Sequence, residues 1–183
     1  MDQTSDWFKG WVFLTMNKKW LTLLSFFIIL AGAFGCSSEN LNETSHKEMP
    51  EDFNFTLSYG VMGKQKIDTF EDLVVKDLVE DGTVEANISF TDQEMNEIHS
   101  KMMEFNMMGE LDLNKDNSCS SEPEIITVWT IQMEGETKSF NYNSFCDVSN
   151  DIERLRKFEH FITGLMEEKD AYKKLPPSNG AYE

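Results

Sequence analysis

Short stretches in which every second residue is apolar constrain the fold of this chain more than any other feature of its sequence. In 53–59, FNFTLSY, single polar residues separate the aromatic and aliphatic ones, which is the period of a strand with one buried face. The stretch 84–90 repeats this pattern after Asp81-Gly82, a pair that favours the positive φ angles of a tight hairpin turn. We therefore expect 84–90 to pair antiparallel with a strand over 67–77 that is interrupted or bent near 71–72.

A second hairpin is predicted after Pro123. Residues 124–133 are rich in β-branched and aromatic side chains, which suit a strand. Glu134-Gly135 is a turn signal, and the chain returns over 137–142. Together the strands predict an antiparallel sheet of about five strands with one apolar face.

Two helices are expected to cover that apolar face. The first begins at Thr91, which can form a capping box with Glu94, and Gly109 ends it. Its apolar residues recur at helical spacing: Met95, Ile98, Met102 and Phe105.

The second helix is predicted after Ser149 or Asn150, either of which can cap it. Apolar residues recur at helical spacing over 152–166, and Pro176-Pro177 stops the helix. The order βββαββα predicts an α+β fold, with two helices packed on one face of an antiparallel sheet. A single domain would occupy 53–175 and leave 176–183 as a loose C-terminal tail.

The segment 16–35 is typical of a secretory signal. Two lysines precede an uncharged run over 20–30, and small residues then lead to Cys36. The end of the segment resembles a bacterial lipobox, in which cleavage frees a cysteine whose thiol receives a diacylglyceryl group, although Ala33 and Phe34 depart from its usual residues. The apolar run is shorter than the roughly 20 residues of a spanning helix, so a retained membrane span is the less favoured alternative. We predict lipidation of Cys36.

Lipidation would anchor the protein to the outer face of the cell membrane, because two acyl chains anchor stably where one binds marginally. Residues 1–15 precede the signal and are expected to be a misassigned start, with Met16 as the true one, or else an extension. Residues 36–52 are polar and are predicted to be a flexible tether. The net charge of −17 disfavours contact with nucleic acid.

Cys119 and Cys146 are the two cysteines that remain once Cys36 is lipidated. In an oxidising compartment two such thiols usually pair. The bond would close a loop around the second hairpin and stabilise the fold by roughly 3.5 kcal/mol. A redox pair or a cysteine nucleophile would need a shorter spacing or a histidine setting, so we predict a structural disulfide.

Two hypotheses for a metal site arise. Thioethers can bind Cu(I), but we favour a role in filling the core for the methionines near the first helix: Met95, Met102, Met103, Met107 and Met108. Asp112, Asn114 and Asp116 have the spacing of the first ligands in a calcium loop. Asn117 stands where that loop needs glycine and Glu122 comes one residue early, so an exposed polar loop is favoured. We expect no metal and no cofactor.

Beyond the signal and Cys36, three short stretches carry a resemblance to a known group. They are Asp68-Thr69-Phe70, Lys76-Asp77-Leu78-Val79 with Asp81-Gly82, and Tyr172-Lys173-Lys174-Leu175-Pro176-Pro177. With them the chain resembles the uncharacterised small lipoproteins found in Bacillus and related Gram-positive bacteria. The resemblance implies a lipid-anchored envelope protein and implies no particular activity.

We identify no catalytic residue. The sequence has no nucleophile elbow, zinc-type histidine spacing or phosphate loop, and His46, His99 and His160 are far apart. The favoured function is a non-catalytic binding or interaction module at the cell envelope, with an envelope protein or a small ligand as partner. The alternative is a secreted envelope hydrolase whose carboxyl groups are brought together only by the fold.

Overall fold

The computed structural model describes residues 48–113 and 118–182. The predicted signal, Cys36 and most of the predicted tether therefore lie outside the described residues. The centre of the calcium-loop pattern, at 114–117, lies outside them as well.

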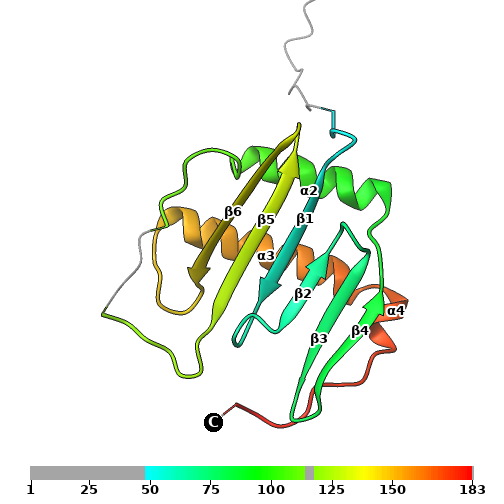
Figure 1. Cartoon of the computed structure of the whole chain (residues 1–183), viewed down its shortest axis with the longest axis vertical. Coiled ribbons are helices and arrows are strands. Elements are labelled where there is room, and N and C mark those ends of the chain that lie inside the picture. The colour runs from blue at the N-terminus through cyan, green and yellow to red at the C-terminus, as the bar shows by residue number, and fades with distance from the viewer. Residues whose placement is uncertain (1–47, 114–117, 183) are drawn as a thin grey trace, which may run out of the picture. The chain divides into compact units, whose positions relative to one another are not determined.

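Antiparallel strands form a six-stranded sheet in the order β4-β3-β2-β1-β5-β6 (Figure 1). The strands are β1 (Asn54–Tyr59), β2 (Gln65–Asp68), β3 (Leu73–Val79), β4 (Gly82–Asn87), β5 (Ile126–Met133) and β6 (Glu136–Asn143). The predicted antiparallel sheet and both predicted hairpins, β3–β4 and β5–β6, are confirmed.

The prediction of about five strands was one too low. The interruption expected near 71–72 is confirmed, but it is a turn that reverses the chain and divides the predicted strand 67–77 into β2 and β3. The backbone N–H of Phe70 donates to Asp68 Oδ1 at 3.0 Å, a local bond that favours a turn over an extended chain. Asp72 then adopts a φ of 51°, which reverses the chain. As a result β2 pairs antiparallel with β3, with Ile67 opposite Val74.

Three helices are described, one more than predicted: α2 (Asp92–Glu104), α3 (Asn150–Glu167) and α4 (Asp170–Lys173). Thr91 caps α2 through the predicted capping box with Glu94, and Ser149 caps α3. The predicted final helix is divided because Lys169 has an extended backbone. Its ammonium group lies 2.7 Å from a carboxylate oxygen of Glu94, which ties the break to the start of α2.

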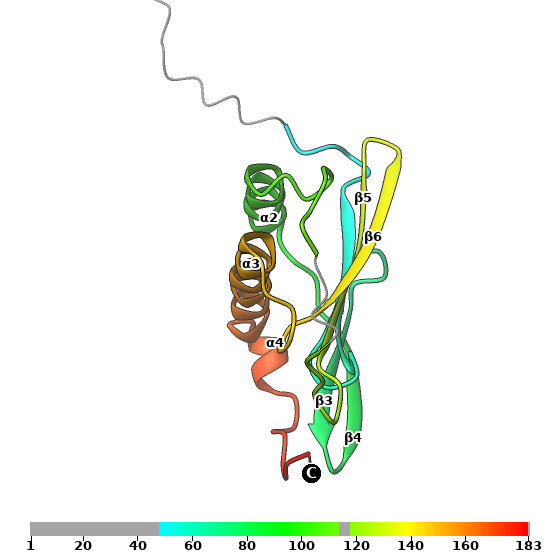
Figure 2. The same ribbon diagram turned by 90° about the vertical axis from the view of Figure 1, so that its left-hand side faces the viewer.

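The helices lie on one face of the sheet, as Figure 2 shows, and the core fills the space between them. Trp129 of β5 is at its centre, with ring centroids of Phe55 and Phe158 at 6.0 and 5.7 Å. Met102 and Met107 are buried in this core, as the favoured hypothesis expected, whereas Met103 is exposed. Within the described residues no helix is long and apolar enough to cross a membrane.

Both ends of the described chain are attached to the sheet. The carboxylate of Asp52 accepts the backbone N–H groups of Glu134 and Gly135 at 3.0 and 2.6 Å, so the chain enters the domain beside the β5–β6 turn. The C-terminal tail, which we expected to be loose, is hydrogen-bonded to β3: Asn179 donates its N–H to the Leu78 carbonyl at 3.2 Å.

Candidate functional site

Residues 144–149, which we name the stapled loop, connect β6 to α3 and expose two large apolar side chains. Phe145 is 64% exposed and Val148 is 70% exposed, whereas Cys146 and Asp147 between them are 5% and 2% exposed. Single exposed apolar residues are ordinary. Here two of them are presented by a loop whose middle is packed into the domain.

A disulfide joins the stapled loop to the segment before β5. Cys119 and Cys146 are bonded, with their Cα atoms 5.5 Å apart, so the pairing predicted from the sequence is confirmed. The bond spans 27 positions of sequence and encloses the β5–β6 hairpin. It holds the middle of the stapled loop in place directly beside Phe145.

Side chains at both ends of the loop fix its backbone. Asn143 Oδ1 accepts the N–H groups of Phe145 and Cys146, both at 2.9 Å. Asp147 Oδ2 in turn accepts the N–H of Asn143 at 2.7 Å. Arg156 of α3 donates from Nη2 to the Asp147 carbonyl at 2.7 Å. These hydrogen bonds hold the backbone around Phe145 in one conformation.

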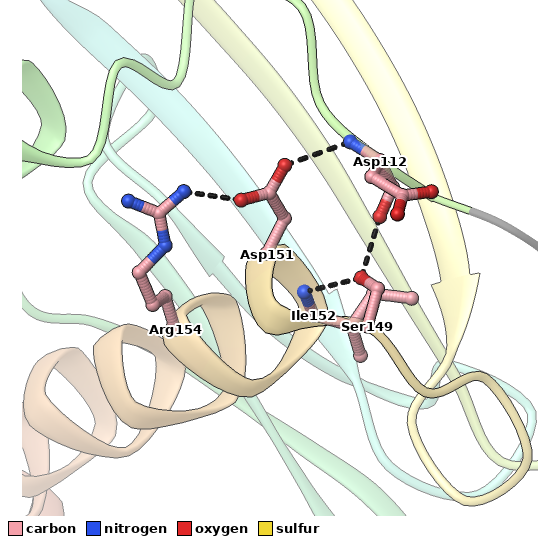
Figure 3. Close-up of polar contacts among 5 residues, drawn as sticks. All are labelled: Asp112, Ser149, Asp151, Ile152 and Arg154. Carbon is pink, nitrogen blue, oxygen red and sulfur yellow. Dashed lines mark hydrogen bonds and ion pairs between the residues drawn. The ribbon is translucent and has the colours of Figure 1, made fainter.

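The end of the loop is also bound to the segment that precedes the disulfide, as the close-up in Figure 3 shows. Ser149 Oγ accepts the Ile152 N–H at 3.1 Å, as a helix cap, and donates to the Asp112 carbonyl at 2.6 Å. Asp151 accepts the Asp112 N–H at 2.8 Å and pairs with Arg154. These two partners lower the pKa of the Asp151 carboxyl group, the backbone bond from Asp112 more than Arg154.

These hydrogen bonds give Asp112 a structural role, which differs from the calcium-ligand role considered for it in the sequence. Its backbone N–H and carbonyl both bind the first turn of α3. Asn114 and Asp116 lie outside the described residues, so their part of the calcium pattern stays untested. Within the described residues, no group of three or more His, Cys, Asp or Glu side chains is arranged to hold a metal ion.

A shallow hollow lies beside Val148, and its other lining residues are polar or charged. Ser149, Asn150, Glu153 and Arg156 line it together with Val148. The stapled loop can thus offer two apolar side chains to a partner while charged and amide groups beside Val148 form hydrogen bonds. This combination of an apolar centre with a polar rim is the usual composition of a protein interface.

The carboxyl group most relevant to the hydrolase alternative belongs to Glu159 of α3. Its Oε2 accepts the hydroxyl groups of Thr127 and Tyr142, at 2.9 and 3.2 Å. Burial raises the pKa of Glu159, against the opposing effect of these bonds, and it raises the pKa of Tyr142 as well. Glu159 therefore links α3 to β5 and β6 from within the domain.

The histidines that the structure describes have packing or surface positions. His99 is buried on α2, with its ring 5.1 Å from that of Phe53 in an edge-on arrangement. His160 is exposed on α3. His46 lies outside the described residues.

Comparisons with known proteins give this chain no family. The sequence matches no known family model and no curated protein. The resemblance to small Bacillus lipoproteins stays a prediction, and the function is inferred from the geometry of the site.

Proposed function

We propose that this protein is a lipid-anchored, non-catalytic binding module at the outer face of the cell membrane, and that its stapled loop contacts an envelope protein. One observation carries the proposal. Phe145 and Val148 are largely exposed on a loop whose backbone is fixed by the Cys119–Cys146 disulfide and by Asn143.

A fixed loop of this kind suits binding because it loses little conformational freedom when a partner arrives. Ordering a mobile side chain at an interface costs about 0.5–1.5 kcal/mol, and pre-organisation reduces such costs. Aromatic side chains at the centre of an interface also contribute a large share of binding energy. Phe145 is the residue of the stapled loop best suited to that role.

The position of the loop supports the same proposal. The chain enters the domain where Asp52 binds the Glu134-Gly135 turn, and the stapled loop follows Asn143 at the other end of β6. An eight-residue strand spans roughly 25 Å. A lipid on Cys36 would thus attach through one end of the hairpin and leave the opposite end accessible to a partner.

The hydrolase alternative has less support. Its acidic site would need a carboxyl group that a substrate can reach, whereas Glu159 accepts hydroxyl groups from both Thr127 and Tyr142 under α3. These bonds give the carboxyl group a structural task. The exposed chemistry of the stapled loop is apolar and favours binding.

Site-specific photocrosslinking in living cells tests the binding role. A photoreactive phenylalanine analogue is placed at Phe145 or, as a matched control, at Phe70, which is 41% exposed in the β2–β3 turn. We expect one envelope protein to crosslink at position 145 and not at position 70. Recovery of the same proteins from both positions, or of none from position 145, would contradict the proposal.

Labelled palmitate tests the anchor separately. The wild-type chain is expected to incorporate the label, and Cys36→Ser is expected to lose it because the acceptor thiol is gone. Cys36→Ser should also fail to capture the partner in cells, since the protein is no longer held at the membrane. Equal labelling of the two chains would exclude lipidation at Cys36.

A further inference from the structure

At the end of the β5–β6 hairpin opposite the stapled loop, five methionines line one open hollow of about 340 Å³. We name it the methionine hollow, and its lining residues are Met102, Met103, Met107, Met108 and Met133, with Asn106, Glu134 and Glu136. Three of the five methionines, Met102, Met107 and Met133, are buried. Met103 is 38% exposed and Met108 is half-buried, so thioethers extend from the core to the surface.

The local backbone explains why these side chains gather. The last turn of α2 carries Met102 and Met103, and the chain then reverses at Asn106, which has a φ of 52°. After this reversal the N–H of Met107 donates to the Met102 carbonyl at 3.1 Å. Met133 comes from the end of β5. The hollow thus collects thioethers from two elements that are far apart in the sequence.

Both sides of the hollow are fixed before any ligand arrives. Lys138 of β6 donates from Nζ to the carbonyl of Met107 at 2.9 Å and also to the carbonyl of Gly109. On the other side, Asp52 holds the turn that begins with Glu134. The segment after α2 and the β5–β6 turn are therefore both secured to the sheet.

From this arrangement we propose that the methionine hollow binds one Cu(I) ion through thioether sulfur atoms. Thioethers are soft, neutral ligands that select Cu(I) over hard cations such as calcium and magnesium. The two carboxyl groups of Glu134 and Glu136 outnumber the one ammonium group beside the hollow, that of Lys138, and the excess of negative charge favours a cation. An apolar ligand would gain nothing from those two carboxyl groups.

The disulfide strengthens this assignment. A compartment in which Cys119 and Cys146 are oxidised also removes free thiols, which are the other soft ligands that proteins offer. Methionine cannot form a disulfide, so it remains available to a soft metal ion there. The core role expected for these methionines is real for Met102 and Met107, and metal binding adds a function to their exposed neighbours.

The test is a titration of the detergent-solubilised full chain carrying Cys36→Ala, which leaves no free thiol. Cu(I) is supplied under ascorbate, without thiol reductants, and competes with a colorimetric Cu(I) chelator. Ag(I) serves as a redox-inert second probe by calorimetry. We expect one ion per chain for each probe.

Methionine-to-leucine variants give the decisive comparison because leucine keeps the volume and apolar character and removes the sulfur. Met103→Leu combined with Met108→Leu is expected to weaken Cu(I) binding at least tenfold, as is Met133→Leu. Met95→Leu, on α2 but outside the hollow, should leave the affinity unchanged. Circular dichroism shows that each variant is folded.

Two results would overturn the proposal. One is the absence of Cu(I) and Ag(I) binding, which would make the hollow a seat for an apolar group of a partner or simply a surface depression. The other is equal affinity in the wild-type chain and in the Met103→Leu/Met108→Leu/Met133→Leu variant. Either outcome leaves the role proposed for the stapled loop intact, because that role rests on Phe145 and Val148.

Discussion

The two ends of the β5–β6 hairpin are both rigid, but they present opposite shapes and chemistries. At the turn end, Asp52 and Lys138 secure a hollow lined by thioethers and two carboxyl groups. At the other end, a disulfide and Asn143 secure a loop that exposes Phe145 and Val148. A hollow can receive a small ligand, whereas exposed apolar side chains on a fixed loop can insert into a larger partner. The same hairpin can therefore support two independent contacts.

Removing the Cys119–Cys146 disulfide is the strongest test of whether the two ends of the hairpin function independently. The double variant Cys119→Ala/Cys146→Ala should lose about 3.5 kcal/mol of unfolding free energy, because the unfolded chain regains the freedom of a 27-position loop. Urea denaturation measures this loss, with Cys36→Ala as the control. Crosslinking at position 145 should fall while Cu(I) affinity in the hollow stays within about twofold. Equal losses at both ends would show that the ends are coupled.

Truncating the side chains of Phe145 and Val148 tests the stapled loop without removing the disulfide or the hydrogen bonds that hold its backbone. Phe145→Ala combined with Val148→Ala should weaken partner binding by tenfold or more, which corresponds to about 1.4 kcal/mol. Stability should change by less than about 0.5 kcal/mol, since both side chains are largely exposed. Affinity for the crosslinked partner and urea denaturation are the measurements.

The control for the Phe145→Ala/Val148→Ala variant is Phe70→Ala, which removes an exposed phenylalanine side chain from the β2–β3 turn. Its partner affinity should equal that of the wild-type chain. If Phe70→Ala weakens binding as much as the Phe145→Ala/Val148→Ala variant does, general surface hydrophobicity rather than the stapled loop is responsible.

A smaller effect is expected between the two ends, at Glu159. Its pKa in the folded protein is raised by burial, so its contribution to stability is complete below the unfolded pKa and is lost as pH rises through the folded pKa. Glu159→Gln removes the ionised form, whose burial is unfavourable, and should therefore stabilise the protein at pH 7. Thermal unfolding of both chains between pH 4 and 8 measures this gain.

The two unfolding curves should converge toward pH 4, where the carboxyl group of Glu159 is protonated in the wild-type chain. Neither Cu(I) affinity nor crosslinking at position 145 should change in Glu159→Gln. A stability difference that is constant across the pH range would contradict the assigned role of this carboxyl group.

Much of the fold could be predicted because its signals are local. The strand over 53–59, the capping box at Thr91 and the Glu134-Gly135 turn are confirmed, and the strand predicted over 84–90 is confirmed as far as Asn87, where β4 ends. The interruption before β3 was expected, but the reversal of the chain was missed because it depends on the bond between Asp68 and the Phe70 N–H. The acidic residues there are compatible with a bent strand as well as with a turn.

The candidate site was predicted only in part, since exposure is decided by packing. Compartment chemistry predicted the Cys119–Cys146 pair, but Phe145 and Val148 are apolar residues of the kind that usually enter a core. Their exposure becomes apparent only in the structure, where a disulfide and hydrogen bonds hold the backbone of the loop that carries them. The methionines in α2 and just after it could be recognised as a group in the sequence. Met133 lies 25 or more positions later and joins them only because β5 pairs into the sheet.

The central position of β1 has a mechanical consequence. β1 is paired on both sides, with β2 and with β5, and it is the strand through which the N-terminal chain enters. In the proposed arrangement, a pull between the membrane and a partner at the stapled loop would act along the strands in opposite directions. Such shear loads many interstrand hydrogen bonds at once, whereas unzipping breaks them one after another. If the chain is anchored and bound as proposed, the sheet would carry tension along its strands without opening.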